Sequence, residues 1–118
     1  MKKYSVGSNE ELQKNSIVTV EEARKATNDY FCGDELATQV WINKYALKDS
    51  AGNLYERSPE DMHRRMAREI ARIEAKYPNP MSEDELFELF DRFKYIIPQG
   101  GPMTGIGNNF QVSSLSNC

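Results

Sequence analysis

The stretch SPEDMHRRMAREIARIEAKY, residues 58–77, carries the clearest helix signal in the chain, and the predicted fold is built around it. Ser58 suits a helix N-cap, and Pro59 suits the first helical position, where a missing N–H costs nothing. Asp61 stands within reach of the cap, as a shorter form of the capping box. Apolar side chains then recur at steps of three or four residues, which predicts one buried face of a helix about 18 residues long. These side chains are Met62, Met66, Ile70, Ile73 and Tyr77.

Two helices are predicted before this stretch. Thr19 with Glu22 forms a capping box at the start of the first, which is expected to end near Gly33. Asp34 can cap the second. Within that second helix, Trp41 is the expected large anchor of the core, because its ring offers the most apolar area.

One further helix is predicted after the long one. Ser82 with Glu85 makes another capping box, and the helix that follows, over 83–93, has a strongly apolar side that must pack on the other helices. Residues 48–57 are rich in Asp, Ser, Gly and Asn and predict a turn or short hairpin. Four helices with short links therefore predict an all-α bundle over 19–97.

Composition limits the class of protein. The 118 residues suffice for one domain, and 39% hydrophobic with 28% charged residues is ordinary for a soluble protein. A net charge of −3 gives no general attraction to nucleic acid or anionic membrane. No apolar run approaches a membrane span, and the start lacks the apolar block of a signal peptide, so a cytoplasmic protein without a membrane partner is expected. Residues 1–18 show no periodicity and are expected to be flexible.

A basic stripe along the long helix is open to two interpretations. It consists of Arg65, Arg68, Arg72 and Lys76. The stripe can face phosphates, or it can be a solvated face with charge pairs four residues apart, and we favour the solvated face. The expected pairs are Glu60 with Arg64, Asp61 with Arg65, and Arg65 with Glu69.

For the histidine and one of the two cysteines, a structural role is favoured over a chemical one. His63 is the lone histidine, and no second histidine or cysteine stands at ligand spacing, so no metal site is predicted. Cys32 precedes a glycine at a helix end. It can be redox-active or a small apolar filler, and we favour the filler.

The last segment, FKYIIPQGGPMTGIGNNFQVSSLSNC (residues 93–118), has a different pattern. Residues 95–97 look extended, a loop rich in glycine and proline follows, and residues 110–115 are expected to form a strand. The loop has no Lys followed by Ser or Thr after its glycines, so by itself it is a weak phosphate signal. The sequence stops on Cys118, whose thiol can serve as a nucleophile or reductant among small polar neighbours.

Three stretches resemble one known family, the catalytic subunit of ribonucleotide reductases, and most closely its adenosylcobalamin-dependent (class II) branch. They are KYIIPQGGPMTGIGNNFQVSSLSNC, YFCGDELATQVWINKYALKDSAGNLYERSPEDMHRRMAREIARIE and KYPNPMSEDELFELF. The resemblance covers the chain from about Val20 onward. It implies a mainly α fold, in which a helical amino-terminal domain (19–97) is followed at 98–118 by the first strand and substrate loop of a truncated α/β reductase barrel.

The resemblance also implies a site. Gly101, Pro102, Asn117 and Cys118 are the positions that would bind a ribonucleotide. Cys118 matches the first of two family cysteines that deliver reducing equivalents and end as a redox-active disulfide, and the second is absent from this chain. The family often has Ser or Thr at or next to Gly101, so a hydroxyl contact is missing here. Adenosylcobalamin is the implied cofactor, with its site outside this chain. The alternative is a metal-radical partner subunit.

Two functions follow from these observations. The first is the amino-terminal part of a reductase that makes deoxyribonucleotides for DNA replication, inactive without the remainder of its catalytic subunit. The alternative is a stand-alone helical protein-interaction module without catalytic activity. We favour the first, because a free-standing bundle has no reason to carry the segment beyond its last helix. A gene fragment, a split reductase and an intein junction all fit the stop at Cys118. The reductase class (I or II), the phosphate level of the substrate, the effectors and the oligomeric state stay open.

Overall fold

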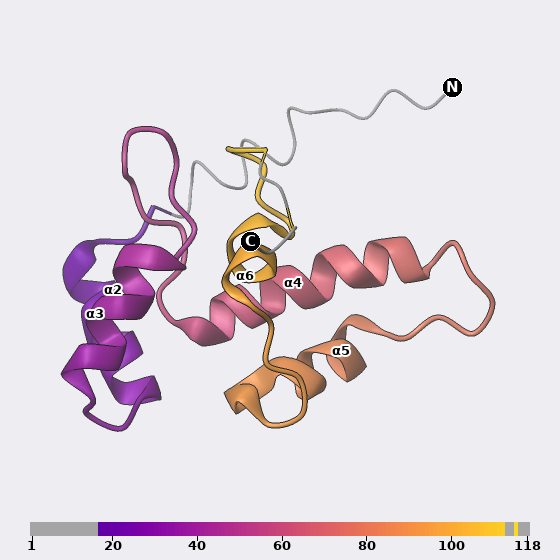
Figure 1. The fold of residues 1–118 in the computed structure, drawn as a ribbon, viewed down its shortest axis with the longest axis horizontal. Helices are drawn as coiled ribbons and strands as arrows, with labels where there is room; N and C mark the ends of the chain where they lie inside the picture. Colours follow the sequence, from indigo (N-terminus) through magenta and orange to yellow (C-terminus); the bar gives the residue numbers. More distant parts are fainter. Residues whose placement is uncertain (1–16, 113–114, 116–118) are drawn as a thin grey trace.

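The computed structural model describes residues 17–112 and 115, and these residues form helices joined by short connections (Figure 1). The helices are α2 (Val20–Tyr30), α3 (Glu35–Lys44), α4 (Pro59–Glu74), α5 (Glu83–Phe90), the short 3-10 helix η1 (Asp91–Phe93) and α6 (Gly100–Gly105). α4 runs through the centre, α2 and α3 pack against each other at one end, and α5 packs along α4. The described part of the chain contains no strand beyond isolated bridges, so the prediction of a mainly α fold is confirmed.

Three of the helices begin where the sequence predicts. Thr19 and Glu22 form the full capping box of α2, with the Thr19 hydroxyl accepting from the Glu22 N–H at 3.2 Å. Asp34 Oδ1 accepts from the N–H of Ala37 at 3.0 Å and so caps α3. At α5, Ser82 Oγ accepts from the Glu85 N–H at 3.1 Å, which is one of the two bonds of the expected box. These short-range bonds satisfy N–H groups that a helix start leaves without intrahelical partners.

The start of α4 differs from the prediction in one respect. Pro59 occupies the first turn as expected, but the side chain of Ser58 makes no capping hydrogen bond. Asp61 Oδ2 instead accepts from the backbone N–H of Arg57 at 2.8 Å, one residue before the cap. The predicted short capping box at Ser58 is therefore wrong, and the carboxylate ties the incoming chain to the first turn of α4.

The core forms where α4 meets the other helices. Met62 and Met66 are fully buried, and Trp41 donates from Nε1 to the sulfur of Met62 at 3.4 Å, which confirms Trp41 as a core anchor. Burying each such side chain contributes about 1.5–3 kcal/mol. The predicted buried face stops short, however, because Ile73 is 43% and Tyr77 62% exposed. The carboxyl end of α4 therefore extends beyond the helices that cover its first half.

Residues 48–57 form the predicted turn as a small hairpin. Asp49 Oδ1 accepts from the N–H groups of Ala51 and Asn53, at 2.9 Å each, which closes the turn. Leu54 then forms antiparallel bridges with both Lys48 and Val18. Val18 is buried, and its N–H donates to Leu54 at 2.8 Å, although the sequence places it in a flexible segment. Residues 1–16 of that segment lie outside the described residues.

The chain between α5 and α6 also differs from the sequence-based expectation. Residue 95 lies in a bend and residues 96–99 carry no regular structure, so no strand forms over the segment 95–97 that the sequence predicts to be extended. The predicted glycine-rich loop is wrong at Gly100–Gly105, which forms α6. Residues 110–112 and 115 belong to no strand, and the other positions of the predicted strand lie outside the described residues. Among the described residues, no helix has the length and apolar character that crossing a membrane requires.

Candidate functional site

Two of the four predicted substrate residues lie in α6. Gly101 and Pro102 are both half-buried there, and a Cβ on Gly101 would lie 3.6 Å from the carbonyl oxygen of Leu115. The backbone just before the end of the sequence therefore returns to α6. Asn117 and Cys118 lie outside the described residues, so their contact with Gly101 and Pro102 stays a prediction.

α6 is a helix built from residues that disfavour helices. Its sequence, GGPMTG, contains three glycines and a proline, each of which is a weak helix former. Pro102 is tolerated because it lies in the first turn, and the hydroxyl of Thr104 donates to the carbonyl of Gly100 at 3.0 Å. A helix of six residues is far below the roughly 12–15 that an isolated helix needs. Contacts with the rest of the fold must therefore hold it.

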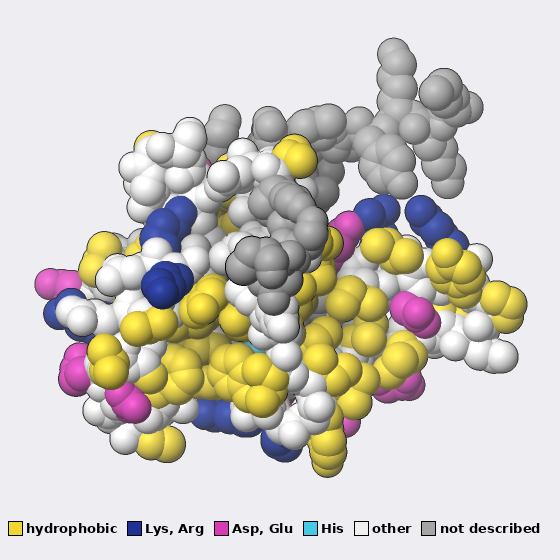
Figure 2. Space-filling model, in the orientation of Figure 1, with side chains coloured by type: hydrophobic (Ala, Val, Ile, Leu, Met, Phe, Trp, Pro, Cys, Tyr) yellow, Lys and Arg dark blue, Asp and Glu magenta, His cyan; other side chains and the backbone are white. Residues whose placement is uncertain are grey.

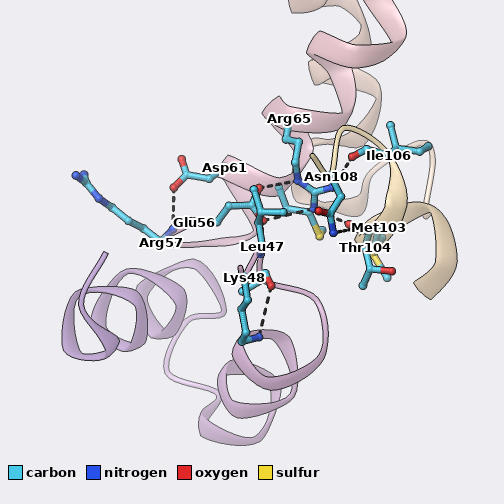
Figure 3. Close-up of polar contacts among 12 residues, drawn as sticks. Leu47, Lys48, Glu56, Arg57, Asp61, Arg65, Met103, Thr104, Ile106 and Asn108 are labelled. Carbon is cyan, nitrogen blue, oxygen red and sulfur yellow. Dashed lines mark hydrogen bonds and ion pairs between the residues drawn. The ribbon is translucent and has the colours of Figure 1, made fainter. Parts of the chain in front are cut away.

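Arg65 of α4 makes several of these contacts. Its Nε donates to Glu56 Oε2 at 2.9 Å, and its two terminal nitrogens donate to the carbonyls of Ile106 and Met103 at the carboxyl end of α6 (Figure 3). Glu56 Oε1 in turn accepts from the backbone N–H of Leu47 at 2.9 Å. We call these five residues the Arg65 network. It joins the hairpin, α4 and α6 through buried polar groups.

Burial decides the electrostatics of the network. The side chain of Arg65 is 9% exposed and that of Glu56 is 4% exposed. Burial raises the pKa of the Glu56 carboxyl, while the guanidinium of Arg65 and the N–H of Leu47 oppose that rise. A buried charge is costly unless every group around it is paired, and here both carboxylate oxygens accept hydrogen bonds. Arg65 also supplies positive charge to the end of α6, where helix carbonyls are left without partners.

Gly107 lets the chain after α6 pass close to this network. Its φ of +73° belongs to the left-handed region, and a Cβ there would come within 2.9 Å of Arg65 Cγ and 3.3 Å of the Arg65 carbonyl oxygen. The sequence predicts a loop rich in glycine and proline at this position. At Gly107, the structure shows that glycine is needed for packing against α4.

The favoured interpretation of the basic stripe is wrong for Arg65, because that side chain is buried in the network. The remaining charge pairs also differ from the expected ones four residues apart. Arg64 pairs with Asp84 of α5 at 2.8 Å, and Arg72 pairs with Glu69 at 2.6 Å. In sequence, Arg65 stands between Met62 and Met66, the two buried methionines of α4. That position is a sequence signal that Arg65 lies at the edge of the buried face of the helix. No sequence signal identified Glu56 as its partner, since nine residues and a change of direction separate the two.

His63 belongs to the core. It is 0% exposed, its ring is stacked on Phe90 with centroids 6.3 Å apart, and it meets Phe93 edge-on at 4.7 Å. Neither ring nitrogen has a hydrogen-bond partner. Burial, with a smaller contribution from Arg65, lowers the pKa of His63 from 6.5 to about 4, against an opposing effect of Asp91. Within residues 17–112 and 115, no group of three or more His, Cys, Asp or Glu side chains is placed to hold a metal ion.

The side chain of Cys32 contradicts its interpretation as an apolar filler. It is exposed, at the end of α2, with a φ of +54°. A filler would be enclosed by apolar neighbours, so this thiol is a surface group.

An apolar pocket of about 210 Å³ adjoins α6. Its lining consists of Phe31, Ala37, Val40, Trp41, Tyr45, Phe93 and Met103. Figure 2 shows hydrophobic side chains gathered on this face, between the α2–α3 pair and α5. The surface that these residues present to the pocket is apolar, so it offers no polar contact for a nucleotide. Tyr45 also lies close to the start of α6, since a Cβ on Gly100 would come within 3.3 Å of its ring.

Comparison with known proteins agrees with the resemblance read from the sequence. The profile of the family described as "Ribonucleotide reductase, all-alpha domain" matches residues 33–100, which is more than half of the 118 residues and contains α3, α4, α5 and η1. No curated protein and no solved structure matches the chain. The match stops at the first residue of α6, so the resemblance of 98–118 to the start of a reductase barrel stays a prediction. This chain belongs to the family of the ribonucleotide reductase all-alpha domain.

Proposed function

We propose that this chain acts as the amino-terminal part of a ribonucleotide reductase catalytic subunit, which converts ribonucleotides to 2′-deoxyribonucleotides for DNA replication by a radical mechanism. The observation that carries the proposal is the family match over 33–100, which contains α3, α4 and α5, whose buried apolar side chains belong to one core cluster. The chain is inactive by itself in this proposal, and the remainder of the catalytic subunit is its partner. The cytoplasm is the proposed location.

The proposed substrate contacts lie at α6 and the segment that follows it. In this proposal Gly101 and Pro102 present backbone to the ribonucleotide, and Asn117 and Cys118 contact it as well. A Cβ on Gly101 would lie 3.6 Å from the carbonyl oxygen of Leu115. This position of Leu115 supports the proposal, because Leu115 is only two residues before Asn117 in sequence and lies beside Gly101. A hydroxyl side chain is missing at Gly101, so backbone groups make that contact.

Cys118 supplies one of two reducing thiols in the proposed reaction. Its partner is a cysteine of the remaining polypeptide. The two thiols give up two electrons and two protons and form one S–S bond, while hydrogen replaces the 2′-hydroxyl, which leaves as water. Two thiols therefore balance the reduction of one ribonucleotide, and the disulfide must be reduced before the next turnover.

Adenosylcobalamin, or alternatively a metal-radical partner subunit, supplies the radical when bound. The described residues do not fit a corrin, because the pocket beside α6 is lined by apolar side chains and His63 is fully buried between aromatic rings. The cofactor is therefore proposed to bind to the remainder of the enzyme.

The second candidate is a helical interaction module without chemistry. The observation that favours it is a set of large apolar side chains that stay exposed, namely Leu36, Tyr95 and Ile97. Exposed apolar groups of this kind suit contact with another protein. The same side chains suit contact with the remainder of a reductase equally well. A measurement of enzymatic activity is therefore needed to distinguish the two candidate functions.

The test is an assay of ribonucleotide reduction with adenosylcobalamin and a dithiol, for the purified chain alone and for the chain combined with the remainder of the subunit. We expect helical circular dichroism and no turnover for the chain alone, and turnover for the combination. Turnover by the chain alone would reject the claim that it is inactive by itself. A combination that assembles but does not reduce ribonucleotides, with either radical source, would favour the interaction module.

A further inference from the structure

Arg65 makes hydrogen bonds to two backbone carbonyls in addition to its ion pair with Glu56. Its guanidinium donates to Glu56 and, on the other side, to the carbonyls of Met103 and Ile106. The planar fork of arginine can engage a carboxylate and separate carbonyls at once, whereas the ammonium of lysine is a compact point charge. The four charge-assisted bonds, two of them to α6, therefore fix the position of α6 relative to α4.

Side-chain hydrogen bonds also hold the backbone within α6 and just after it. Thr104 donates from its hydroxyl to Gly100 at 3.0 Å, and Asn108 donates from Nδ2 to the carbonyl of Thr104 at 3.0 Å. The side-chain oxygen of Asn108 then accepts from the N–H of Phe110 at 2.9 Å, and the ring of Phe110 lies 4.7 Å from that of Tyr55 in the hairpin. The backbone from Gly100 to Phe110 is thus tied to α4 and the hairpin.

We propose that Arg65, oriented by Glu56, is a positioning residue that sets the backbone of Gly101 and Pro102 for the ribonucleotide. This inference rests on the proposed function. In this inference, Arg65 does not contact the substrate. It acts through α6, whose six residues are too few to hold a helix without tertiary contacts. Loosening the Arg65 network then weakens substrate binding and leaves the chemical step unchanged.

Two variants separate positioning from folding. Arg65→Lys keeps the buried positive charge beside Glu56 but cannot reach both carbonyls of α6. The double variant Glu56→Gln/Arg65→Met removes both buried charges and keeps an acceptor for Leu47, so no unpaired buried charge is left. Arg68→Met is the matched control, because Arg68 lies on the same helix, well exposed, with its nearest carboxylate oxygen 3.8 Å away.

The first readout is hydrogen exchange in the 118-residue chain. We expect the amides of Met103 and Ile106, which bond within α6, to exchange about tenfold faster in both variants, while α3 keeps its protection. Unchanged exchange in both variants would overturn the inference without touching the proposed function. Arg68→Met should exchange like the natural chain.

The second readout is the kinetics of the chain combined with the remainder of the subunit. We expect KM for the ribonucleotide to rise about tenfold in both variants with kcat within about twofold, the pattern for lost binding without lost chemistry. Turnover by the natural assembly with an unchanged KM in the variants would overturn the positioning role and leave the proposed function standing. A fall in kcat with KM unchanged would also overturn it. No turnover by the natural assembly would reject both.

Discussion

The backbone N–H of Arg92 donates to the hydroxyl of Tyr30 at 2.9 Å, and the guanidinium of Arg92 lies 4.2 Å from the centre of the same ring. Arg92 has a φ of +57°, an uncommon conformation for a residue other than glycine. The contact joins the end of α2 to the turn after α5, which are 62 residues apart in sequence. Tyr30 therefore stabilises a backbone conformation that the local sequence disfavours.

Tyr30→Phe should destabilise the fold by about 1–2 kcal/mol, because it removes the acceptor for the Arg92 N–H and keeps the ring. Urea unfolding followed by circular dichroism measures the change. Tyr77→Phe is the control, since Tyr77 is exposed and its variant should unfold like the natural chain. Equal midpoints for Tyr30→Phe and the natural chain would mean that the hydroxyl does not support the turn.

Met62→Ala should cost about 2–5 kcal/mol, the range for emptying a fully buried site. The residue touches Trp41 through its sulfur, so the fluorescence of Trp41 should also change in the folded variant. Ile73→Ala, on the exposed part of the same helix, should cost less than about 1 kcal/mol. Similar costs at the two positions would mean that the core extends along the whole of α4.

Gly107→Ala should cost more than Gly52→Ala. Both residues have positive φ, which an alanine adopts at a cost of about 1–2 kcal/mol, but only at Gly107 does the new methyl meet a neighbour, Arg65 Cγ at 2.9 Å. The difference between the two unfolding free energies isolates that close contact. A Gly52→Ala variant as destabilised as Gly107→Ala would show that backbone conformation alone sets the cost.

Stability should fall as the pH is lowered from about 6.5 to about 4, through His63. The folded protein lowers the pKa of His63, so over this range the unfolded chain binds more protons, and unfolding becomes easier as the pH falls. This shift in the pKa of His63 contributes up to about 3 kcal/mol to the pH dependence of the unfolding free energy, at 1.36 kcal/mol per pKa unit. His63→Leu removes the titrating group, and its unfolding free energy should lose that part of the pH dependence. Identical pH profiles for the variant and the natural chain would refute the assignment to His63.

Cys118→Ser should reduce turnover of the assembled enzyme to the level of the assay blank, because a hydroxyl cannot form the S–S bond that yields the two electrons. Cys32→Ser is the control. The Cys32 thiol is exposed at the end of α2, apart from the proposed reaction, so that variant should keep full activity. Full activity of Cys118→Ser would remove Cys118 from the mechanism.

Local sequence patterns were sufficient to predict α2, α3, α4 and α5 and most of their starts. Thr19, Asp34 and Ser82 each bond to an N–H three residues ahead, so the signal and its partner lie in the same short stretch. The apolar spacing of Met62 and Met66 likewise located the buried face of α4. The family resemblance rests instead on the three quoted sequence stretches, and the family match supports it over residues 33–100.

The conformation of the glycine-rich segment and the pairing of the buried charges depend on tertiary contacts instead. Local propensity makes GGPMTG a loop, but Arg65 donates to the carbonyls of Met103 and of Ile106, the residue that caps this segment, and α6 forms. The pairing of Arg65 with Glu56 depends on how the hairpin lies against α4, and no spacing rule contains that information. Contacts between residues distant in sequence therefore set the geometry at Gly101 and Pro102, because a helix this short has too few bonds of its own to fix its position.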